Sequence, residues 1–199
     1  MDSWLVVFVC CIIGCIPGWP LFVLRKEERL RRLKSNESWR FIFAFLPNWS
    51  DFIRGSAVSL VLGLWFNSYV RLHPESSLLA LGAVFTVMAA GTLAQSLFLQ
   101  YHRLLVVPVF YIFGLHLFIA GWDIGLLSVL GALGISYGFK SPLLAPPLAG
   151  IILLVSGFVI NVPITILTVG VVVAIIPASL ALVTGRTTSL PYLQRSGRF

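Results

Sequence analysis

Two long segments with almost no charge limit what this chain can fold into. Residues 104–139 contain a single charged side chain, Asp123, and residues 141–184 contain none. As one straight helix, the first segment would be about 54 Å long, well beyond the ~30 Å hydrocarbon core of a bilayer. Each segment therefore has to reverse direction. The sequence predicts the reversals at "AGWDIG" (120–125) and "NVP" (161–163), where Gly, Asp, Asn and Pro favour turns.

The composition requires a lipid solvent. Of the residues, 58% are hydrophobic and 11% are charged, and the mean hydropathy is +0.97. Soluble domains carry roughly 25% charged residues, so a soluble fold of this size could not bury so much apolar surface. We therefore predict an all-α, multi-pass integral membrane protein in which residues 1–199 form a single helical membrane domain.

The positions of the basic residues predict the topology. Seven spans are expected: 4–24, 52–70, 77–99, two within 104–139 and two within 141–184. With the N-terminus outside and the C-terminus inside, every Lys and Arg except Arg71 lies on the inner side, as the positive-inside rule requires. A six-span alternative would need one of the long segments to be re-entrant or tilted.

The net charge of +7 is concentrated beside the predicted spans. This placement indicates contact with anionic lipid headgroups on the cytoplasmic side rather than with nucleic acid. Residues 25–53 mix basic and aromatic side chains, which is typical of an interfacial helix, although a plain cytoplasmic loop also fits. Residues 185–199 form a basic cytoplasmic tail. The candidate headgroup or anion contacts are Arg25, Arg40, Arg54, Arg103 and Lys140.

Three polar residues inside the long apolar segments are candidates for chemistry: His116, Asp123 and Asn161. His116 and Asp123 are seven residues apart and would share a helix face if the helix continued between them, forming a proton relay or cation site. The alternatives are a neutral histidine bonded to a neighbouring helix and external turns at Asp123 and Asn161. Asp51 and Arg54 are expected to pair on one helix.

No cofactor and no metal site are predicted. The alternative is haem or a pigment bound at His116. The three cysteines all fall in the first predicted span: Cys10, Cys11 and Cys15. We interpret them as small apolar residues of that helix.

One helix-packing motif stands out, the GxxxG pair Gly134 and Gly138. It predicts a close helix contact within the chain or in a homo- or hetero-oligomer.

The sequence as a whole favours a small transporter or channel component, or an accessory subunit of a membrane assembly. The alternative is a membrane-embedded enzyme acting on a lipid, isoprenoid or lipid-linked substrate.

Overall fold

The fold is described from a computed structural model that places residues 4–16, 43, 46–98, 104–185 and 187–189. The α-helices are α1 (Leu5–Cys15), α3 (Leu46–Leu72), α4 (Ser77–Phe98), α5 (Val109–Ile119), α6 (Trp122–Gly138), α7 (Ala145–Val159) and α8 (Ile164–Thr184). Short 3₁₀ helices, η2 (Pro74–Ser76) and η3 (Pro142–Leu144), precede α4 and α7. The strands β1 (Leu104–Val106) and β2 (Thr187–Ser189) pair in parallel, with Leu104 opposite Thr187.

The described part of the chain is helical apart from this short pair of strands, which confirms the predicted helical class. Within these described residues, three helical segments are long and apolar enough to cross a membrane: Pro74–Leu97, Pro142–Val159 and Ile164–Thr184. The apolar helices α1, α5 and α6 are shorter than this. The chain thus has the helices of a membrane protein.

The predicted chain reversals lie where the local turn chemistry places them. Gly121 separates α5 from α6 with a φ of +105°, a conformation that glycine adopts without steric penalty. Asn161 has a φ of +61° between α7 and α8, and Pro163 is the N-cap of α8. The predicted span 77–99 also agrees with α4. These features depend on neighbouring residues only.

Three predicted boundaries were wrong. The first helix ends at Cys15, because Pro17 disfavours the helical conformation at Ile16, which is extended, and the rest of the predicted span, 17–24, lies outside the described residues. The helix expected from residue 104 begins at Val109, after β1, because Pro108 has no amide donor and follows extended chain. The second span, expected from residue 52, belongs to a helix that already begins at Leu46. The predicted interfacial segment 25–53 falls mostly outside the described residues, and its last part belongs to α3.

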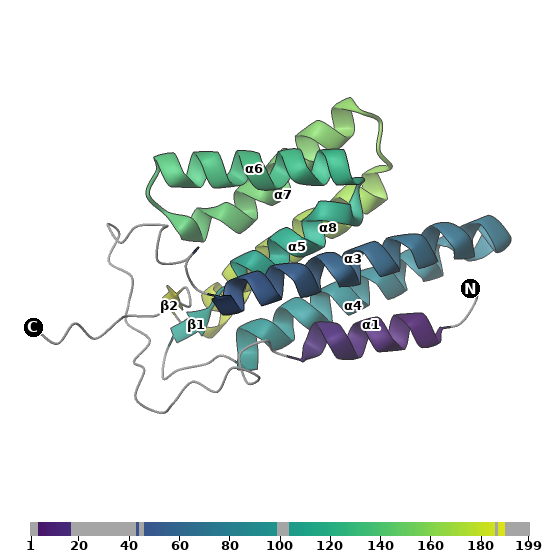
Figure 1. The fold of residues 1–199 in the computed structure, drawn as a ribbon, viewed down its shortest axis with the longest axis horizontal. Coiled ribbons are helices and arrows are strands. Elements are labelled where there is room, and N and C mark those ends of the chain that lie inside the picture. The colour runs from purple at the N-terminus through teal and green to yellow at the C-terminus, as the bar shows by residue number, and fades with distance from the viewer. Residues whose placement is uncertain (1–3, 17–42, 44–45, 99–103, 186, 190–199) are drawn as a thin grey trace, which may run out of the picture.

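The helices form one elongated bundle (Figure 1). Helices α3 and α5 lie side by side in its middle, α1 packs against α4 at one flank, and α6 and α7 form a pair at the other. One apolar core joins α1, α3, α4, α5 and α8 around Leu62, Met88 and Tyr111. A second core joins α5, α6 and α7 around Phe113 and Ala149.

Candidate functional site

A cluster of polar side chains surrounds the C-terminal end of α1. On α3, the Nη2 atom of Arg54 lies 2.6 Å from Oδ1 of Asp51, and both side chains are nearly buried. Arg54 also donates a hydrogen bond to the carbonyl of Ile16. Its guanidinium carbon lies 5.3 Å from the ring centroid of Tyr111 on α5, within the range of a cation–π contact. One arginine therefore joins three helices.

Gln95 on α4 completes this cluster. Its amide nitrogen Nε2 donates to the carbonyl oxygens of Gly14, at 3.0 Å, and Ile16, at 3.1 Å. The last carbonyls of any helix lack partners within that helix, and side chains of other helices can supply hydrogen-bond donors to them. Gln95 and Arg54 supply those partners from two neighbouring helices. We call Asp51, Arg54, Gln95 and Tyr111, with the carbonyls of Gly14 and Ile16, the α1-end cluster.

Three buried atoms of the α1-end cluster have no hydrogen-bond partner among the described residues: Nε of Arg54, Oε1 of Gln95 and the hydroxyl of Tyr111. Gly14 and Gly91 make room for that hydroxyl. A Cβ atom at Gly91 would lie 2.3 Å from the tyrosine oxygen, and one at Gly14 would lie 2.9 Å from it. The cluster thus holds an unused donor, an unused acceptor and a hydroxyl that can act as either.

His116 occupies a separate position. Its side chain is fully buried in α5, and its Nε2 lies 3.0 Å from the carbonyl oxygen of Gly170 on α8. Its other nitrogen, Nδ1, has no partner within the described chain. The hydrogen bond to α8 matches the interpretation of a histidine that bonds a neighbouring helix. It also leaves only Nδ1 for the haem or pigment ligation considered above.

The structure does not bring His116 and Asp123 together. The chain reverses at Ala120 and Gly121, so the two residues lie on different helices. Asp123 is exposed in the first turn of α6, where the helix dipole favours a negative charge. Asn161 is exposed in the turn between α7 and α8. Neither lies in the α1-end cluster.

Among the predicted headgroup contacts, the described residues include Arg54 and Lys140. Arg54 is turned into the bundle toward Asp51 and Ile16, whereas Lys140 is exposed just beyond the end of α6 with a φ of +53°. Arg25, Arg40 and Arg103 fall outside the described residues. Within those residues, no group of three or more His, Cys, Asp or Glu side chains is arranged to hold a metal ion.

The two GxxxG glycines of α6 are exposed, and a Cβ at Gly134 or Gly138 would meet no other atom within 4 Å. The close helix contact on this helix is made instead by Gly125, where a Cβ would lie 2.3 Å from the carbonyl oxygen of Leu117 on α5. The small-residue motif therefore faces away from the other helices that the structure describes.

The role of Gln95 and Tyr111 in this cluster was not predicted. The only signal for either in the sequence is a polar group within an otherwise apolar segment, which in a membrane protein is itself a reason for attention. No protein-family model, curated protein or solved structure matches this chain.

Proposed function

We propose that the chain is a seven-span membrane protein, with its N-terminus outside and its C-terminus inside, that works as a small transport component. The α1-end cluster is the proposed contact point for the transported solute. The orientation follows from the basic residues, of which all but Arg71 fall on the inner side in this arrangement.

The observation that carries this proposal is that α1 ends at Cys15, where side chains of α3 and α4 bond the carbonyls of Gly14 and Ile16. Its 11 residues extend over about 16 Å, roughly half of a ~30 Å hydrocarbon core. At its start, the ring of Trp4 packs on Trp65 and Tyr69, with centroids 5.2 and 5.6 Å away, and such aromatic groups mark a membrane interface. Carriers use interrupted helices of this kind because the exposed backbone groups at the break can hold a solute or ion.

The charges of the cluster constrain the solute. Asp51 offsets the charge of Arg54, so the cluster is formally neutral, and its unused groups include both a donor and an acceptor. A neutral or zwitterionic polar solute therefore fits better than a simple ion, which would have to displace one member of the pair.

The water accessibility of introduced cysteines tests the proposed transport function, and the test does not require the solute to be known. In a chain with Cys10, Cys11 and Cys15 replaced by Ala, Thr92→Cys places a thiol one helical turn from Gln95. Thr92 is fully buried and its hydroxyl bonds only within α4, to the carbonyl of Met88. A transport site has to open to water, so we expect a small membrane-impermeant thiol reagent to label this cysteine.

Ser128→Cys is the matched control. Ser128 is also fully buried, but its hydroxyl donates to the carbonyl of Ala149 in the contact between α6 and α7. We expect labelling at position 92 to be at least about tenfold faster than at position 128, and slower again when a transported solute is present. Equal and very slow labelling at both positions would argue against a water-accessible site.

The exposed face of α6 supports a second candidate function, that of an accessory subunit in a membrane assembly. Gly134 and Gly138 leave this face open for another helix, and Lys140 next to it can contact an anionic headgroup. Tyr137 is 67% exposed on the same helix. Disulfide cross-linking of Tyr137→Cys in native membranes, in the cysteine-free chain, tests this role. A covalent dimer would show self-association, and a single larger adduct would show a different partner.

A further inference from the structure

An open apolar groove runs between the N-terminal halves of α4 and α8. It has a volume of about 390 Å³ and is lined by α4 from Leu78 to Phe85 and by α8 from Thr165 to Val172. Gly82 lies in its floor, where a Cβ would meet no atom within 4 Å. Both helices belong to the segments that are long and apolar enough to cross a membrane, so the groove faces lipid.

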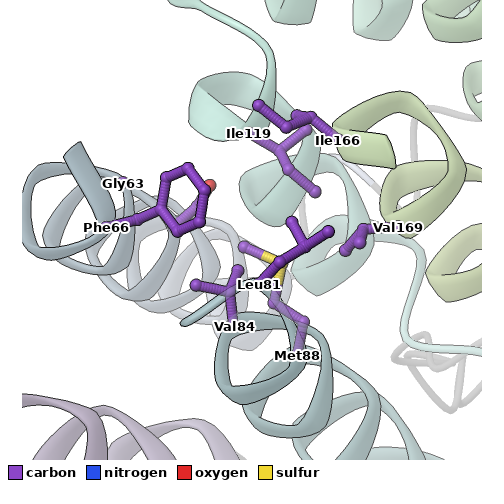
Figure 2. Close-up of a pocket in the computed structure, with 9 residues that line it drawn as sticks. Gly63, Phe66, Leu81, Val84, Met88, Ile119, Ile166 and Val169 are labelled. Carbon is purple, nitrogen blue, oxygen red and sulfur yellow. The ribbon is translucent and has the colours of Figure 1, made fainter. Parts of the chain in front are cut away.

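The groove adjoins a narrow cavity inside the bundle. Leu81 and Val169 line both spaces. The cavity has a volume of about 30 Å³ and lies where α3, α4, α5 and α8 meet, with the side chains of Met88, Phe66 and Ile119 around it (Figure 2). It reaches side chains that the surrounding lipid does not touch, since Met88 is only 1% exposed.

One hydroxyl in the wall of this cavity has no partner. Ser59 is fully buried, lines the cavity, and its oxygen makes no hydrogen bond to any described residue. The cavity is large enough for a water molecule, but buried waters typically make about three hydrogen bonds. Since the rest of the lining is apolar, a water here would have one partner. A hydrocarbon group therefore fits this cavity better than water does.

We propose that the groove and the cavity together bind one hydrocarbon chain of a bilayer lipid, which enters between α4 and α8 and ends beside Met88 and Ser59. The length of α4 along the groove and the cavity supports a lipid chain as the occupant. From Leu78 to Met88, α4 rises about 15 Å, which equals the hydrocarbon depth of one leaflet. A partner helix, about 10 Å across, could lie on the groove but could not enter the cavity. In the proposed orientation, the lipid belongs to the outer leaflet.

A photoreactive lipid tests the proposal. The full chain is reconstituted in nanodiscs of phosphatidylcholine in which a fraction of the lipid carries a diazirine near the end of one acyl chain. After illumination, the labelled residues are identified by mass spectrometry. We expect label on Met88 and Ser59, and we expect Gly82→Leu, which fills the groove floor, to reduce this label at least about fivefold.

Gly134→Leu is the matched control, because Gly134 is also an exposed helical glycine with open space around it. It should leave the label on Met88 unchanged, and both variants should retain the thermal stability of the parent protein. Label confined to exposed apolar residues, with none on Met88, would overturn the proposal. The proposal would also be overturned if Met88 were labelled in nanodiscs but not in native membranes, because a protein partner would then cover the groove in the native membrane.

The lipid site depends on the membrane location of α4 and α8 and not on transport. Loss of the lipid label would leave the α1-end cluster untouched, and a thiol at position 92 that proves inaccessible would leave the lipid site untouched. The two proposals therefore fail separately.

Discussion

Arg54 lies in a nearly buried position because groups from three helices surround it. Asp51 offsets the free-energy cost of burying the Arg54 charge. Without this counter-ion, the desolvation cost of the guanidinium group would not be compensated. Asp51→Asn should therefore lower the free energy of unfolding by about 3 kcal/mol, measured by titration with SDS in mixed micelles. Glu75→Gln is the control, since Glu75 is 71% exposed and 3.7 Å from His73. Loss of this exposed pair should cost under about 0.5 kcal/mol. Equal losses would mean that Arg54 is solvated in the folded protein.

The hydroxyl of Tyr111 allows a second prediction for a single residue. Since this buried oxygen has no described partner, Tyr111→Phe should change the free energy of unfolding by less than about 1 kcal/mol or stabilise the protein. Gly91→Ala should destabilise it by about 1–3 kcal/mol, because the new methyl meets the tyrosine oxygen. In the Tyr111→Phe background the same alanine should cost less. The double-mutant cycle gives this coupling directly. A large loss from Tyr111→Phe alone would mean that the hydroxyl binds a group absent from this structure.

Two glycines meet where α3 packs against α5, Gly55 and Gly114. A Cβ at Gly55 would lie 2.4 Å from the carbonyl oxygen of Tyr111, and one at Gly114 would lie 2.3 Å from that of Phe52. Because the obstacles are backbone atoms, the helices would have to separate, and either alanine substitution should cost about 2–3 kcal/mol. Gly82→Ala and Gly134→Ala meet no neighbour and should be neutral or stabilise by up to about 1 kcal/mol through helix propensity. Thermal unfolding in detergent compares all four variants, and equal effects would show that α3 and α5 are not in close contact.

Local features of the helices can be predicted from the sequence, whereas contacts between distant segments cannot. The turns at Gly121 and Asn161 and the bounds of α4 follow from local residue chemistry, and the sequence predicted them. The α1-end cluster joins residues far apart in the chain, such as Gln95 and Gly14, and no local pattern records that contact. The pairing of β1 with β2 is equally remote in sequence. The GxxxG rule selected Gly134 and Gly138, whereas Gly55, Gly114 and Gly125 make the close contacts, because the rule does not indicate which face meets a neighbour.

For the molecule as a whole, the arrangement of the helices predicts on which side of the membrane each turn lies. Asp123 is exposed at the start of α6 and Lys140 is exposed just after its end, so the two residues lie at opposite ends of one helix. In the proposed orientation, position 123 is outside and position 140 is inside. In the cysteine-free chain, Asp123→Cys should react with a membrane-impermeant maleimide in intact cells, while Lys140→Cys should react only after the membrane is permeabilised. The reverse pattern would invert the orientation and place the α1-end cluster nearer the outer surface. Reaction at both positions in intact cells would mean that α6 does not cross the membrane, and the proposed number of spans would then be wrong.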